Sequence, residues 1–145
     1  MSLHLQLKAR AQSGRPIRVG LIGAGKFGSM YLAQVIRTPG VHLVAIADLN
    51  PAMAQLNLAR VGWKPEQTQA RSLDHAIQSG LTHLSDDWQA MIQHPEVEVI
   101  VECTGVFIGL WRSTRHDLRF GRLGENLWFS GSGCGQRSQV VASLL

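Results

Sequence analysis

The sequence predicts an α/β fold with a doubly wound parallel sheet, because short buried strands alternate with helices over residues 17–105. Three apolar, β-branched runs are typical of strands that are covered on both faces. They are "IRVGLIG" at 17–23, "VHLVAIAD" at 41–48 and "VEVIVECTG" at 97–105. A second observation is the glycine-rich turn that directly follows the first run. Since a complete sheet of this kind has about six strands, we expect an incomplete sheet, the N-terminal half of the fold, with about three well-formed strands and an open strand edge.

Residues 1–16 precede the first strand as an N-terminal helix or arm. The stretch 3–13 suits a short helix, whereas its leucines at positions 3, 5 and 7 also suit a strand, so both structures remain open. The tripeptide "GRP" at 14–16 separates this arm from the domain that follows.

Helices are expected between the strands. Behind the glycine turn, Phe27, Tyr31 and Val35 recur four residues apart and therefore share one helical face. The next helix has Asn50 as a natural N-cap and Pro51 at its first position, which are both common start signals. The later segments are, in order, the helix at 50–62, a helix at 72–80, a short strand or extended link at 82–86, and a helix at 86–95 that Asp86 or Asp87 caps.

The turn after the first strand has the spacing G-x-G-x-x-G, with Gly23, Gly25 and Gly28. Asp48 ends the next strand, 20 positions beyond Gly28. Together these features predict a Rossmann-type dinucleotide site. Gly23 permits a sharp turn, Gly25 lets the backbone approach a pyrophosphate, and Gly28 lets the helix pack close to the sheet. The helix N-terminus adds a partial positive charge. The alternative is a turn that binds nothing, or one that binds S-adenosylmethionine or FAD.

Asp48 indicates which dinucleotide is preferred. Its carboxylate can accept both ribose hydroxyls of the adenosine half and would repel a 2′-phosphate, and no arginine follows it in "ADLNPA". We therefore expect NAD rather than NADP. Ala24, Lys26 and Phe27 complete the turn and count among the cofactor-binding residues. The Lys26 side chain either contacts phosphate or is simply solvated.

The end of the third strand supplies further candidates. Ligands of such sheets lie beyond the carboxyl ends of the strands, so Thr104 and Gly105 are expected to line the ribose–nicotinamide side. The alternative is a plain strand-ending turn. Cys103 is interpreted as a small buried apolar residue rather than a nucleophile. Trp63 and Trp88 are interpreted as packing anchors.

Composition argues against several other functions. The net charge of +4 and the isoelectric point of about 9.7 come mostly from residues 106–145, which hold five arginines against two acidic residues. We therefore expect no nucleic-acid partner. No apolar run approaches the roughly 20 residues that span a membrane, and the start lacks the apolar core of a signal peptide. The two cysteines and six histidines show no metal-ligand spacing. A cytoplasmic protein without a metal site is expected, and its oligomeric state remains open.

The stretches "GLIGAGKFG", "ADLNP" and "VECTG", within a match over about residues 14–105, resemble the NAD(P)-binding half of homoserine-dehydrogenase-like oxidoreductases that carry a C-terminal SAF domain. The resemblance implies a Rossmann fold, a nicotinamide cofactor and hydride transfer on a small hydroxy or carbonyl substrate. It carries over the three glycines as phosphate binders, Asp48 as ribose binder, and Thr104 with Gly105 as cofactor-loop residues. It carries over no catalytic residue.

Residues 106–145 depart from the family pattern and show no clear helical or strand period. A shifted reading frame is one account, because a one-base shift at residues 130–135 ("SGSGCG") can yield the family's "VEADV". The other account is a divergent tail. We expect this segment to be irregular and poorly ordered, and the chain to be a fragment that binds NAD(P) without turnover of its own. The alternative is a non-catalytic nucleotide-binding or redox-sensing module.

Overall fold

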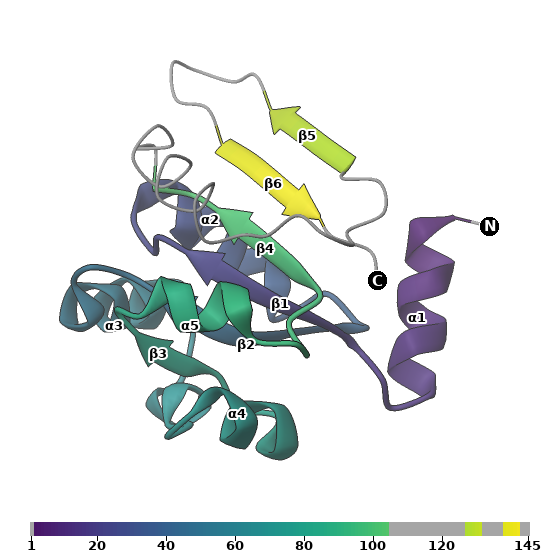
Figure 1. Ribbon diagram of the computed structural model, residues 1–145, viewed down its shortest axis with the longest axis horizontal. Coiled ribbons are helices and arrows are strands. Elements are labelled where there is room, and N and C mark those ends of the chain that lie inside the picture. Colours follow the sequence, from purple (N-terminus) through teal and green to yellow (C-terminus); the bar gives the residue numbers. More distant parts are fainter. Residues whose placement is uncertain (1, 105–126, 132–137, 143–145) are drawn as a thin grey trace.

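The computed structural model describes residues 2–104, 127–131 and 138–142 (Figure 1). The stretch that the sequence leaves open between helix and strand forms a helix, α1. Within the described residues the order is α1 (Leu3–Gln12), β1 (Ile17–Ile22), α2 (Lys26–Val35), β2 (Val41–Ala47), α3 (Pro51–Arg60), the 3₁₀ helix η1 (Pro65–Thr68), α4 (Leu73–Ser79), β3 (His83–Ser85), α5 (Trp88–Gln93), β4 (Val99–Glu102), β5 (Leu127–Gly131) and β6 (Ser138–Ala142).

Four parallel strands form the sheet of the domain, in the order β3-β2-β1-β4. The expected limit of about three strands is therefore wrong. The additional strand is β3, in the stretch that the sequence leaves open between strand and link, and it pairs with the second half of β2. A segment of three residues is too short to show a period in its side chains. The unpaired backbone edge of β2 is what makes this segment a strand.

The outer edge of β4 is also paired. β6 runs antiparallel to β4, and β5 runs antiparallel to β6 (Figure 1). The expected open strand edge therefore does not lie at β4, because β6 pairs there. Strand pairing uses backbone N–H and C=O groups, so it does not require the alternating side chains that the sequence of this region lacks. The remaining residues of 106–145, where an irregular or frameshifted segment is expected, lie outside the described residues.

Helices cover both faces of the parallel strands, which confirms the doubly wound architecture. Neighbouring strand residues point to opposite faces, so Leu21 packs with Leu32 under α2 and α3, while Ile22 packs on the other side with α4 and α5. The two tryptophans lie where packing anchors are expected. Trp63 is buried in the first cluster and donates its indole N–H to the carbonyl of Leu32 at 2.9 Å, and Trp88 packs against the second cluster.

The helix starts follow the expected capping chemistry. The side chain of Asn50 accepts a hydrogen bond from the N–H of Met53 at 3.0 Å, at the start of α3. Of the two aspartates that precede α5, Asp87 rather than Asp86 is the N-cap, and its carboxylate accepts from the N–H of Ala90 at 2.9 Å. These bonds satisfy N–H groups that the first helical turn leaves without a partner.

Helix α1 lies near the amino-terminal end of β1, away from the glycine turn (Figure 1). Its Arg10 guanidinium contacts one carboxylate oxygen of Glu98 at 2.9 Å, and the other oxygen accepts from the N–H of Arg18 in β1 at 2.9 Å. Glu98 therefore connects α1 to the start of the sheet. Helix α1 does not lie at the carboxyl ends of the strands.

Candidate functional site

The glycine turn lies where the carboxyl ends of β1, β2 and β4 meet. The N–H of Gly23 donates to the carbonyl of Ala47, the last residue of β2, at 2.8 Å. Gly23 has a φ of +88°, a backbone conformation that L-residues with a side chain rarely adopt. A Cβ at Gly23 would also lie 3.0 Å from the backbone nitrogen of Thr104, just beyond β4. The turn is therefore held against both neighbouring strand ends and leaves no room for a larger residue at this position.

Gly28 and Gly25 serve different purposes in the turn. A Cβ on Gly28 would lie 2.1 Å from the carbonyl oxygen of Gly23, so α2 packs against the turn at a distance that only glycine allows. A Cβ on Gly25 would meet nothing within 4 Å. Gly25 is exposed and extended, and it caps α2 without a side-chain hydrogen bond. The absence of a side chain at Gly25 therefore leaves open space above the start of α2. At Gly28, by contrast, the absence of a side chain lets α2 pack against the turn.

The first turn of α2 has the electrostatics of an anion site. Helix α2 is ten residues long and has no acidic residue in its first turn. Its N-terminal N–H groups and partial positive charge therefore face the open space over Gly25. Lys26 is exposed and Phe27 is half-buried, so the ammonium group of Lys26 can turn either toward that space or toward solvent.

Asp48 lies at the end of β2 and is bonded directly to the turn. Its Oδ2 accepts a hydrogen bond from the N–H of Ala24 at 2.8 Å, and its Oδ1 accepts from the N–H of Asn50 at 2.8 Å. Each carboxylate oxygen has two lone pairs, so both retain capacity for a further donor. The structure thus brings the carboxylate and the glycine turn together, as the spacing from Gly28 predicts, and it gives Asp48 the additional task of fixing the turn.

Two further residues near Asp48, Asn57 and Leu49, are not among those that the sequence predicts. Asn57 in α3 donates its amide N–H to the carbonyl of Ala24 at 2.9 Å, so α3 also supports the turn. Leu49 is 91% exposed although it is a large apolar residue directly after Asp48. The sequence carries no signal for Asn57, which is an ordinary polar residue in a helix. Leu49 does carry a signal, because an apolar residue directly after the acidic end of a strand is a candidate for the same site as that acidic residue.

The end of β4 supplies the third side of the site. Glu102 is 4% exposed, and its Oε1 accepts hydrogen bonds from the N–H of Thr104, at 2.6 Å, and from the Thr104 hydroxyl. Thr104 lies against Gly23 at the start of the glycine turn. Gly105 lies outside the described residues. Burial, with the nearby Glu102 carboxylate, raises the pKa of the Cys103 thiol to about 11. The thiol is therefore protonated at neutral pH, in agreement with its interpretation as a packing residue rather than a nucleophile.

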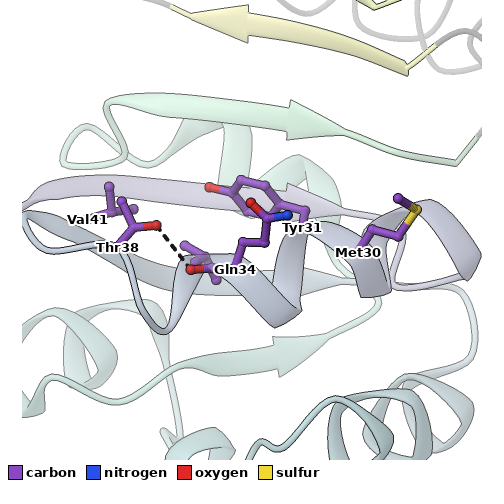
Figure 2. A pocket seen from close by; sticks show the side chains of 6 residues that line it. Met30, Tyr31, Gln34, Thr38 and Val41 are labelled. Atoms are coloured by element: carbon purple, nitrogen blue, oxygen red, sulfur yellow. Dashed lines mark hydrogen bonds between the residues drawn. The ribbon is translucent and has the colours of Figure 1, made fainter. Parts of the chain in front are cut away.

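A shallow groove of about 330 Å³ runs along α2 toward the start of β2 and is lined by apolar and polar side chains (Figure 2). Met30, Tyr31 and Val41 are among its lining residues, and the Thr38 hydroxyl donates to the carbonyl of Gln34 at 3.0 Å. Burial, with the nearby Cys103 thiol, raises the pKa of Tyr31 to about 12. Val41 begins β2, so the groove extends to the end of the sheet opposite the glycine turn and is separate from the site around Asp48.

The arrangement can bind a long ligand with a negatively charged centre. The turn and the helix start offer N–H groups, Asp48 offers acceptors on one side, and the β4 end lies on the other. Across the described ranges, no group of three or more metal-ligating side chains comes together. Within those same ranges, no helix is long and apolar enough to cross a membrane.

Comparison with known protein families matches the part of the chain that forms this site. Residues 17–109, more than half of the chain, match the model of GFO_IDH_MocA, an oxidoreductase family with an NAD-binding Rossmann fold. The matched range begins at β1 and includes the glycine turn, Asp48 and the end of β4. None of the curated proteins that were searched matches the chain.

Proposed function

This chain belongs to the oxidoreductase family with the NAD-binding Rossmann fold, and from that premise we propose that its glycine turn, Asp48 and the end of β4 bind NAD for hydride transfer. One observation carries the proposal. The carboxylate of Asp48 is bonded to the turn at Ala24, while the space above Gly25 is open. A ribose acceptor and a phosphate approach are thus adjacent, as the adenosine half of a dinucleotide requires.

Each part of the cofactor has a proposed position. The pyrophosphate lies over Gly25 at the start of α2, where N–H groups and the helix dipole favour negative charge. The adenosine ribose lies at Asp48, and the exposed side chain of Leu49 offers an apolar surface for the adenine. The nicotinamide half extends to the β4 side, near Thr104 and Gly105. The family is one with an NAD-binding Rossmann fold. We propose NAD rather than NADP because the negative charge of Asp48 would repel a 2′-phosphate.

The substrate class is proposed from the resemblance to homoserine-dehydrogenase-like enzymes. A small hydroxy or carbonyl compound is the expected partner in hydride transfer. Such a transfer needs the substrate held against the nicotinamide with acid–base help. We assign cofactor binding to the residues named above and no catalytic role to any of them, so we expect no turnover from these residues alone.

Isothermal titration calorimetry of the purified chain tests the proposal. NAD and NADH are expected to bind with dissociation constants in the micromolar-to-millimolar range, and NADP more weakly. Absence of heat with all four of NAD, NADH, NADP and NADPH at millimolar concentration, from a chain shown to be folded by circular dichroism, would contradict dinucleotide binding.

Asp48→Ala is expected to weaken NAD binding by about 10- to 100-fold, because a hydrogen bond to a charged group contributes about 1.5–3 kcal/mol. The ratio of NADP to NAD affinity should rise, since the charge that repels a 2′-phosphate is gone. Titration of both nucleotides measures that ratio. Asp48→Asn should raise it too, while retaining one oxygen acceptor for the turn.

Glu66→Ala is the matched control, because it removes one exposed negative charge from η1, outside the site. The preference for NAD should be unchanged in this variant. An unchanged preference in both Asp48 variants would mean that the ribose-binding carboxylate is wrongly assigned.

A further inference from the structure

Glu102 is a buried acidic residue that neither the core nor the cofactor assignment above explains. It ends β4, is 4% exposed, and is in register with the apolar Ile22 of β1. Its Oε1 accepts from both the N–H and the hydroxyl of Thr104. Its Oε2 is buried, and no donor reaches it from the part of the chain that the structure describes.

A carboxylate in this position is a poor choice for stability. A buried polar oxygen without a hydrogen bond costs free energy, and an apolar residue of similar size avoids that cost. Buried polar groups of this kind often mark a functional requirement. Among the described side chains, Glu102 accepts hydrogen bonds from Thr104, two residues further along the chain.

The position of Thr104 relates these hydrogen bonds to the cofactor site. β4 is the parallel neighbour of β1, with Glu102 in register with Ile22, and the N–H of Cys103 donates to the carbonyl of Ile22 at 2.8 Å. Thr104 then lies against Gly23 at the start of the turn. A dinucleotide with its adenosine ribose at Asp48, on the β2 side, and its pyrophosphate over the turn must continue to the β4 side. The segment Glu102–Thr104 therefore borders the nicotinamide half.

We propose that Glu102 is a positioning residue for the nicotinamide half of the cofactor: its buried carboxylate fixes the backbone and hydroxyl of Thr104 against the glycine turn. The proposal rests on the dinucleotide function proposed above. It attributes to Glu102 no contact with the adenosine half, which is bound at Asp48.

Two ligands separate this role from a merely structural one. ADP contains the adenosine and both phosphates but lacks the nicotinamide half, so it does not reach the end of β4. Glu102→Leu is expected to weaken NAD binding about tenfold in calorimetric titrations while ADP binds as it does to the unaltered chain. Glu102→Gln keeps an oxygen acceptor for Thr104, and its NAD affinity should stay within about threefold of the unaltered chain.

Each outcome decides between the claims. Equal weakening of NAD and ADP in Glu102→Leu, or no weakening of NAD, would overturn the positioning role. An unaltered, folded chain that binds neither ligand would overturn the dinucleotide function itself. If Glu102→Leu does not fold, Thr104→Ala provides the test, because it removes one of the two donors to Oε1. We expect about threefold weaker NAD binding and unchanged ADP binding, and unchanged NAD binding in this variant would contradict the proposal.

Discussion

Gly25→Val is expected to abolish measurable NAD binding, a loss of 100-fold or more, while the domain remains folded. A Cβ at Gly25 meets nothing within 4 Å, so the side chain starts in open space. It would occupy the space over the start of α2 that the pyrophosphate requires. Valine is a poorer N-cap than glycine, which lowers the free energy of unfolding by about 1 kcal/mol at most. Calorimetric titration with NAD and urea unfolding measure the two effects separately.

Gly25→Ala is the graded companion to this variant, since its single methyl group intrudes less on the same space. Its NAD affinity should fall between those of the unaltered chain and Gly25→Val, with equal or smaller loss of stability. If Gly25→Val binds NAD as tightly as the unaltered chain, the turn does not hold phosphates. Loss of folding in Gly25→Val would contradict the open space at this position.

Gly28→Ala should differ from Gly25→Val by a large loss of stability. In an unconstrained helix, replacing glycine by alanine stabilises by about 1 kcal/mol. Here the new Cβ would lie 2.1 Å from the backbone oxygen of Gly23, which cannot move without displacing the turn. Overpacking of this kind costs about 1–3 kcal/mol, and more when backbone must shift. We expect a net loss of about 2 kcal/mol in the free energy of unfolding, measured by urea denaturation, together with weaker NAD binding.

The matched control for Gly28→Ala is again Gly25→Ala, a glycine-to-alanine change three residues away in the same turn. Helix propensity favours alanine within α2 but not at its N-cap, so a lower stability of Gly28→Ala than of Gly25→Ala reports the lack of space at Gly28. Equal stability of the two variants would show that α2 does not press on the turn in solution.

The sequence by itself determined the chemistry at the start of the fold. Gly23, Gly25, Gly28 and Asp48 are separated by short stretches whose strand, turn and helix are each visible locally. Local signals also located the caps at Asn50 and Asp87, although they left Asp86 as an alternative. Such features are readable because turn geometry and capping depend on residues close together in the chain.

Only the tertiary structure decided which distant groups meet. The sequence left β3 open and did not indicate that β6 pairs with β4, because these pairings join backbone groups that are far apart in the chain. The same holds for the bond from Asp48 to Ala24, the amide of Asn57 on that residue, and the contact of Thr104 with Gly23. The last of these exists because β1 and β4 are neighbours in the sheet although about 80 residues separate them along the chain, as the register of Ile22 with Glu102 shows. Folding the sheet is what turned separate local motifs into one site.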